Sequence, residues 1–384
     1  MIGWEDVYKV AAAMAPLYVA LILGYGSVRW WHMFTPEQCD AINCLVSYFT
    51  LPLFAFEFTS TVDPFEMNYP YIAADVVSKC IIVVAIGFWA KFSTSSNSRG
   101  SWSITSFCLA TLSNTVVVGL PLMKGMLYGQ MGVDLVVQAS VVQSLLWFPL
   151  LLFVMEFRHS WNHHNNFSAA GNATTHTIED SGELDQGKEL EGNNSNNNNN
   201  NALEISKAPA GRPLSFWPLM NVVLRKLAIN PNCYACILGI TWALFSKKCH
   251  IEMPSIVDGS IQILAKAGTG TAMFSMGKSI YTRLFTAMQE RIIACGAGPT
   301  AFGMVLRFIA GPAAMAIGSL AVGLRGNVLR VAIIQAAMPQ SITTFIFAKQ
   351  YGLHADVIST AVIFGTLVSL PVLIAYYAAL ESLP

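Results

Sequence analysis

The sequence has few charged side chains. Only 11% of its 384 residues are Asp, Glu, Lys or Arg, whereas soluble domains carry about 25%. Hydrophobic residues make up 54% of the chain, and its mean hydropathy is +0.50. The formal net charge is zero, so no basic excess points to a nucleic-acid partner. This composition is typical of a polytopic membrane protein.

The sequence also lacks the motifs of hydrolases and of metal sites. No H-E-x-x-H or G-x-S-x-G sequence occurs, and His163-His164 stand in a polar tract without further ligands. Cys233 and Cys236 have the spacing of a redox or metal pair, but no second pair or nearby His completes a site. We therefore interpret both cysteines as packing residues. The sequence predicts neither an enzyme nor a bound metal or cofactor.

Long hydrophobic runs are what the chain has in abundance. Ten of them approach the length that a bilayer requires, and five lie on each side of a polar tract. The expected spans are residues 7–28, 39–60, 70–92, 102–128, 132–156, 226–246, 256–280, 299–323, 328–348 and 354–380. The sequence thus predicts an all-α polytopic membrane protein with a five-helix unit at 1–157 and another at 221–384.

The polar tract at 158–220 separates these two units. It contains the run Asn196 to Asn201 and cannot bury a core, so we expect it to be disordered. The bias of basic residues near the span ends places this tract in the cytosol. Because an odd number of spans precedes the tract, the second unit enters the membrane in the opposite orientation. This arrangement predicts an inverted-topology repeat.

Two spans are interrupted at corresponding places. Proline removes a backbone donor and clashes with the preceding turn, so we expect helices to break or kink at Pro121 and at Pro339. Paired interruptions in two halves are the best sequence pointer to a transporter's substrate site. We expect the second span of each half to weaken midway as well, at Leu51-Pro52 and at Gly268-Thr269-Gly270.

Amide side chains stand near both interruptions. Free N–H groups at half-helix N-termini are suited to a carboxylate, and Asn114 can add an amide donor there. The candidate substrate-binding residues are Asn114, Val117, Pro121, Gln138, Gln143, Gln335, Pro339 and Gln340. The alternative is that these amides only satisfy the helix breaks or face neighbouring helices.

Charged residues inside the spans form a second set. Asp75 and Lys79 are four residues apart, which places them on one helix face as an acid–base pair. This pair is either a proton-linked or conformational switch or a structural ion pair. Glu57 is another carboxylate within a span. We expect Arg307 to lie near a span end and to extend its guanidinium toward the interface.

Several stretches resemble the PIN-FORMED auxin efflux carriers of plants. They include Ala15-Pro16-Leu17-Tyr18-Val19-Ala20, Gly119-Leu120-Pro121-Leu122, Asn230-Pro231-Asn232 and Gln335-Ala336-Ala337-Met338-Pro339-Gln340. The resemblance covers both membrane units and leaves out only the polar tract. It implies ten helices in two inverted five-helix repeats, with scaffold and transport domains and helices that cross at the two prolines.

The resemblance also implies a function. Family members export indole-3-acetate, and related aromatic carboxylates are expected ligands of a homodimer in membrane lipid. The family's crossover asparagine falls on Asn114, and its acid–base pair falls on Asp75 and Lys79. Glu57 departs from the long-loop members, where we expect His or another residue. The short tract favours the endoplasmic reticulum membrane, with the plasma membrane as the alternative.

Two other functions compete with auxin export. One is a Na⁺- or H⁺-coupled symporter of another organic anion, because crossed helices also occur in carriers with sodium sites. Few carboxylates gather at the interruptions, which argues against it. The other is a membrane receptor or scaffold whose tract recruits partners, but a tract rich in Asn has few aromatic anchors for an interface.

Overall fold

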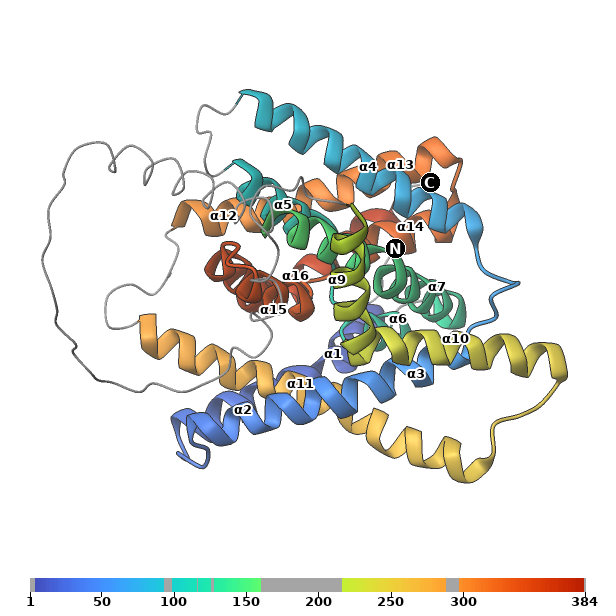
Figure 1. The fold of residues 1–384 in the computed structure, drawn as a ribbon, viewed down its shortest axis with the longest axis horizontal. Helices are drawn as coiled ribbons and strands as arrows, with labels where there is room; N and C mark the ends of the chain where they lie inside the picture. The colour runs from blue at the N-terminus through green and yellow to red at the C-terminus, as the bar shows by residue number, and fades with distance from the viewer. Residues whose placement is uncertain are drawn as a thin grey trace, which may run out of the picture. The chain divides into compact units, whose positions relative to one another are not determined.

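A computed structural model describes residues 4–92, 99–115, 117–125, 128–159, 216–287 and 297–382 (Figure 1). The chain divides into two compact units, one of residues 1–152 with 226–384 and one of residues 153–225. Of the smaller unit, the structure describes residues 153–159 and the start of helix α9 (Phe216–Ile229), all helical. Residues 160–215, most of the predicted polar tract, lie outside the described residues.

The larger unit is built from helices. Its elements in chain order are α1 (Trp4–Arg29), α2 (Pro36–Leu45), η1 (Val46–Thr50), α3 (Leu51–Thr61), α4 (Tyr69–Phe92), α5 (Arg99–Thr111), α6 (Gly119–Gly125), α7 (Gly129–Val142), η2 (Gln143–Trp147), α10 (Pro231–Cys249), α11 (Ser255–Ala287), α12 (Ala297–Val305), η4 (Leu306–Ala310), α13 (Gly311–Val322), α14 (Gly326–Ala336), α15 (Ile342–Gln350) and α16 (Ala355–Glu381). The η elements are single π-helical turns.

The helices have the length and hydropathy of membrane spans. Four described helical stretches are long and apolar enough to cross a bilayer, namely Tyr69–Phe92, Gly129–His159, Gly298–Val322 and Ala355–Glu381. The described residues contain no β-strand, and their one β-bridge pairs Ser113 with Gln340. The chain is an all-α membrane protein, as predicted. The number of ten spans and their inverted repeat stay predictions.

One group of long helices consists of α1, α3, α10 and α11, which we call the long-helix group. Here α1 packs along α11, and α3 packs along both α10 and α11 (Figure 1). Glycines allow the backbones to meet: a Cβ atom on Gly277 would lie 1.9 Å from the Leu21 carbonyl oxygen, and one on Gly24 would lie 1.9 Å from that of Phe274. These positions accept no side chain, so α1 and α11 are held at short range.

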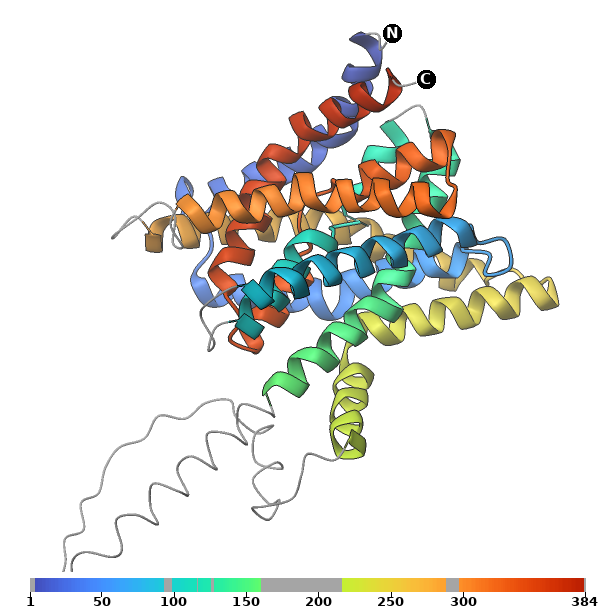
Figure 2. The same cartoon turned by 90° about the horizontal axis from the view of Figure 1, so that it is seen from above.

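A second group contains the interrupted segments, and we call it the crossover group. It comprises α4, α5, α13 and α14, and α4 and α13 run alongside each other in both views (Figures 1 and 2). Again a glycine sets the distance, since a Cβ atom on Gly318 would lie 3.0 Å from the Ala74 carbonyl oxygen. The aliphatic side chains of Ile82, Ala110 and Ala314 form a buried cluster between α4, α5 and α13.

The helices break near both prolines, at Pro339 as the sequence predicted and before Pro121 rather than at it. The first helix ends at Thr111 and α6 begins at Gly119, so the break precedes Pro121, which is the third residue of α6. The N–H groups of a first helical turn have no partner within the helix, so proline costs little there. Pro339 lies inside the second gap, between Ala336 and Ile342.

The expected weakening of the second spans is present in the first half, where a π-turn interrupts the α-helix just before Leu51-Pro52, and is wrong in the second. The helix of residues 36–61 continues through the π-turn η1, and Pro52 lies in the first turn of α3. α11 runs without a break across Gly268 and Gly270. A Cβ atom on Gly268 would lie 3.1 Å from the Thr50 carbonyl oxygen. This glycine therefore permits a close helix contact.

Candidate functional site

The two interrupted segments cross each other and are tied through their backbones. The Asn114 N–H donates to the Pro339 carbonyl at 2.8 Å, and the Ser341 N–H donates to the Leu112 carbonyl at 3.1 Å. These two bonds form the antiparallel bridge between Ser113 and Gln340. Non-helical backbone within the membrane must satisfy its polar groups inside the protein, and each gap does this for the other.

The crossing brings four helix ends together. α5 and α14 end at the gaps, while α6 and α15 begin there. Helix N-termini carry partial positive charge on free N–H groups, and C-termini carry partial negative charge on free carbonyls. The crossover therefore brings both donors for an anion and acceptors for a cation to the two gaps.

Gln143 supports the first gap. Its Nε2 donates to the Ser113 carbonyl at 2.9 Å, and its Oε1 accepts from the Ser113 N–H at 3.3 Å. Gln335 reaches the same residue, with its Nε2 3.4 Å from the Ser113 hydroxyl oxygen. Both amides thus act on Ser113, which favours the structural alternative for their role.

Gln340 supports both helices that flank the crossing. Its Nε2 donates to the Cys108 carbonyl at 3.0 Å and to the Thr344 hydroxyl at 2.8 Å. The donors of Gln340 are therefore used within the protein. Its Oε1 is buried without a hydrogen-bond partner among the described residues.

Asn114 differs from these glutamines. The residue is only 8% exposed, and its Nδ2 is buried without a hydrogen-bond partner in the described part of the chain. Leaving a buried donor unpaired costs about 1–3 kcal/mol. An unpaired donor at a helix crossing is expected where a ligand supplies the acceptor. Val117, in the same gap, is buried and apolar.

The acid–base pair lies in α4 of the crossover group. Lys79 Nζ is 2.7 Å from Asp75 Oδ2, and both residues are buried. Trp147 completes this cluster: its indole N–H donates to Asp75 Oδ2 at 2.9 Å, and Lys79 Nζ lies 4.5 Å from the ring centroid. The sequence analysis missed Trp147. Its position four residues after Gln143, on one helix face, is the signal that would have found it.

Gln138 and Glu57 lie apart from these contacts. Gln138 Oε1 accepts from the Asn68 N–H at 2.9 Å, just before the start of α4. Glu57 is half-buried in α3 of the long-helix group.

The expectation for Arg307 is wrong. Its side chain does not extend to a span end but is fully buried, with 0% of the residue exposed. Nε donates to the Met338 carbonyl at 2.5 Å, and Nη2 donates to the Ala336 carbonyl at 2.9 Å. Nη1 lies 3.4 Å from the Leu109 carbonyl oxygen. The arginine therefore contacts the C-terminal ends of both helices that break.

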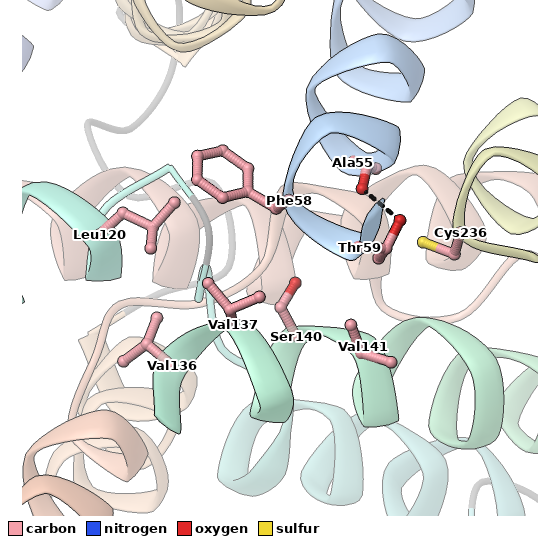
Figure 3. A pocket seen from close by; sticks show the side chains of 9 residues that line it. All are labelled: Ala55, Phe58, Thr59, Leu120, Val136, Val137, Ser140, Val141 and Cys236. Atoms are coloured by element: carbon pink, nitrogen blue, oxygen red, sulfur yellow. Dashed lines mark hydrogen bonds between the residues drawn. The ribbon is translucent and has the colours of Figure 1, made fainter. Parts of the chain in front are cut away.

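A small cavity lies between the long-helix group and the helices that follow the first gap (Figure 3). Its lining residues are Ala55, Phe58 and Thr59 of α3, Leu120 of α6, Val136, Val137, Ser140 and Val141 of α7, and Cys236 of α10. The cavity has room for about one water molecule. The lining is apolar apart from two hydroxyl groups and the thiol. Cys233 and Cys236 are both free and buried, in keeping with a packing role.

Comparison with known proteins agrees with this architecture. Residues 9–377 match the model of a family described as membrane transport proteins. The chain is 58% identical over 383 residues to auxin efflux carrier component 5 of Arabidopsis thaliana, with 99% of each chain covered. The chain belongs to the auxin efflux carrier family. The resemblance seen in the sequence is thereby confirmed, and the protein is a membrane transporter rather than an enzyme.

Other family members support the same assignment over the full length. A probable auxin efflux carrier component 5a of rice is 56% identical over 381 residues, with 99% of each chain covered. Auxin efflux carrier component 8 of Arabidopsis thaliana is 36% identical over 387 residues, with 99% of this chain and 100% of the relative covered. The crossover and its supporting residues therefore lie within the matched region.

Proposed function

We propose that this carrier exports the auxin anion indole-3-acetate from the cytosol and binds its carboxylate at the crossover. The observation that carries the proposal is the amide donor of Asn114 between two broken helices, which is buried and has no partner among the described residues. The relatives are named auxin efflux carriers, which indicates the ligand class. Related aromatic carboxylates are expected to compete.

A carboxylate suits this place because neutral donors lie at both gaps. The N-termini of α6 and α15 begin at the two gaps, and N-terminal N–H groups attract anions. Asn114 adds one hydrogen bond to a charged group, worth about 1.5–3 kcal/mol. Pro121 and Pro339 have no N–H to donate to a ligand. We propose that they contribute to the site by fixing the course of the backbone at each gap.

The flat ring requires room that the present conformation lacks. The cavity of Figure 3 adjoins Leu120, close to the first gap, but it holds about one water molecule. Its walls come from α3 and α10 on one side and from α6 and α7 on the other. Movement of α6 and α7, together with the crossover group, against the long-helix group would open this apolar space. Such a displacement corresponds to elevator-like alternating access.

An inverted repeat of ten spans underlies this proposal. α1 packs along α11, and α10 packs along α3 in the same manner. The first helix of each half thus pairs with the second long helix of the other half, as a two-fold pseudo-symmetry in the membrane plane requires. The gaps before α6 and α15 are equivalent in the same scheme.

The membrane potential supplies a driving force for the anion. An inside-negative potential favours anion export by about 2.3 kcal/mol per charge for each 100 mV. We place the carrier in the endoplasmic reticulum membrane because its tract is short, with the plasma membrane as the alternative. We also propose that it works as a homodimer in lipid.

Uptake into proteoliposomes tests the proposed function. Purified carrier should move radiolabelled indole-3-acetate, and benzoate, as a smaller aromatic acid, should compete more strongly than uncharged indole. An imposed potential should accelerate movement toward the positive side. Absence of indole-3-acetate transport by folded protein under all potentials would remove this function.

A further inference from the structure

Arg307 occupies a place that sequence reasoning and the proposed function leave unexplained. It lies in the π-turn η4 in the middle of the Gly298–Val322 span, and it is fully buried. Arginine stays charged in proteins, so a full positive charge is held at this depth. Such a residue is costly in a membrane unless it has a function or complete compensation.

Within the described ranges, the groups that accept hydrogen bonds from Arg307 are backbone carbonyls. Arg307 donates to the carbonyl of Ala336 at the end of α14 and to that of Met338 in the second gap. It also approaches the carbonyl of Leu109 near the end of α5. Among the residues that the structure describes, no carboxylate forms an ion pair with it. The nearby Asp75 is already bound to Lys79 at 2.7 Å. The charge of Arg307 is therefore not cancelled by an acid.

These carbonyls are the negative ends of the two broken helices. Left alone, they would repel an anion bound between the helices, because a helix C-terminus carries about half a negative charge. In ion-coupled carriers with broken helices, such carbonyl ends and unwound segments coordinate the transported cation. Here the guanidinium of Arg307 donates hydrogen bonds to those carbonyls.

We propose that Arg307 is a built-in counter-charge that replaces a coupling cation at the crossover and makes the site selective for anions. It acts as a positioning and specificity-determining residue, because its donors reach the backbone carbonyls behind the site. The inference rests on the proposed function, since it assumes that the anion binds beside Asn114. It predicts anion binding that needs no sodium ion.

Two ligands of similar shape separate charge selectivity from general damage. Binding of indole-3-acetate and of the neutral indole-3-acetamide should be measured on purified carrier in nanodiscs. In Arg307→Met, affinity for the anion should fall by about ten-fold or more, while affinity for the amide should change by less than about three-fold. Arg307→Lys keeps a charge and should retain more of the anion preference than Arg307→Met.

A matched control removes a different arginine. Arg330, near the start of α14, pairs with Glu381 at 3.2 Å. Arg330→Met should leave the ratio of anion to amide affinity as in wild type. An unchanged ratio in Arg307→Met would overturn the inference, because a merely structural arginine would affect both ligands alike.

The wild-type protein provides a test that needs no variant. Replacing sodium by choline should leave indole-3-acetate binding unchanged, whereas a requirement for sodium would overturn the inference even if Arg307→Met fails to fold. If Arg307→Met fails to fold, the ratio of anion to amide affinity is compared between Arg307→Lys and wild type instead. If wild type binds the anion, an unchanged affinity ratio in Arg307→Met or a sodium requirement refutes only the role of Arg307. Wild type that binds no indole-3-acetate refutes the proposed function and this inference with it.

Discussion

The Gln143 side chain pairs with both backbone groups of Ser113. Nε2 donates to the Ser113 carbonyl at 2.9 Å, and Oε1 accepts from its N–H at 3.3 Å. On its other side the Ser113 segment is bridged to the segment of Gln340. An amide side chain thus takes the place of a neighbouring β-strand, which keeps the unwound backbone satisfied within the membrane.

The first prediction concerns this amide. Gln143→Leu leaves the buried N–H of Ser113 without a partner, at a cost of about 1–3 kcal/mol. It also removes one of two donors to the Ser113 carbonyl, which keeps the Thr115 hydroxyl at 3.3 Å. The melting temperature of the purified carrier should fall, and indole-3-acetate binding should weaken because the gap loses its shape. Thermal unfolding and direct binding in nanodiscs measure the two effects.

Gln130→Leu is the matched control for this change. Gln130 is exposed and bonds only to Asp134 among the contacts described here, so its loss should cost less than about 0.5 kcal/mol. Equal stability and binding in Gln143→Leu and Gln130→Leu would show that the Ser113 contacts do not matter.

The second prediction concerns the close approach of α1 and α11. In Gly277→Ala, the new Cβ atom would lie 1.9 Å from the Leu21 carbonyl oxygen, so the two helices must separate. Overpacking of this kind typically costs about 1–3 kcal/mol. The melting temperature should therefore fall, as followed by thermal unfolding in detergent.

Gly270→Ala tests the same substitution in the same helix without the contact. A Cβ atom there would meet nothing within 4 Å, and alanine is a better helix former by about 1 kcal/mol. The two variants should shift the melting temperature in opposite directions. A fall of similar size in both would mean that the glycines of α11 serve the helix itself rather than its packing.

The third prediction concerns the pair of Asp75 and Lys79. Asp75→Asn leaves the ammonium group of Lys79 buried without its counter-charge, which costs about 3–5 kcal/mol. Because the pair contacts Trp147 and not the open donor of Asn114, turnover should fall more than binding weakens. Transport at saturating indole-3-acetate and a separate binding measurement give the two quantities.

A double variant supplies the control. Removing both charges in Asp75→Asn with Lys79→Met leaves no unpaired ion, so stability should recover relative to Asp75→Asn alone. If Asp75→Asn strongly weakens binding while turnover at saturating indole-3-acetate stays normal, the pair holds substrate and our assignment is mistaken.

Much of the fold was accessible from the sequence because it depends on local properties. Hydropathy and length predicted membrane helices, and proline with asparagine pointed to the broken segment near Asn114. The exact break was not predictable, because Pro121 fits equally well at a kink or in a first helical turn. Gly268 was misread for a related reason: its contact with Thr50 comes from another helix.

Some contacts of the site could likewise be predicted from the sequence, and others could not. Asp75 and Lys79 are four residues apart, so their pairing follows from helix geometry. Arg307 bonds to carbonyls 31 and 198 residues distant in the chain. Backbone acceptors carry no residue-type signal, so no pattern in the sequence could have identified its partners.

The fourth prediction concerns Asn114, whose amide donor is buried and finds no acceptor in the part of the chain that the structure describes. Asn114→Ala removes one hydrogen bond to the carboxylate and should weaken indole-3-acetate binding by roughly ten-fold to more than a hundred-fold. Asn114→Asp should be worse, because it sets a negative charge against the anion. Direct binding on purified protein compares both variants with wild type.

Folding and binding can be separated for these variants. The Asn230 side chain caps α10 by accepting from the Asn232 N–H at 3.0 Å, so Asn230→Ala should cost about 1 kcal/mol of stability without weakening binding. Asn114→Ala should do the reverse: it removes an unpaired donor and so leaves stability close to wild type, yet it should lose affinity. If Asn114→Asp binds indole-3-acetate as tightly as wild type, the carboxylate lies elsewhere. The unpaired amide would then need another explanation.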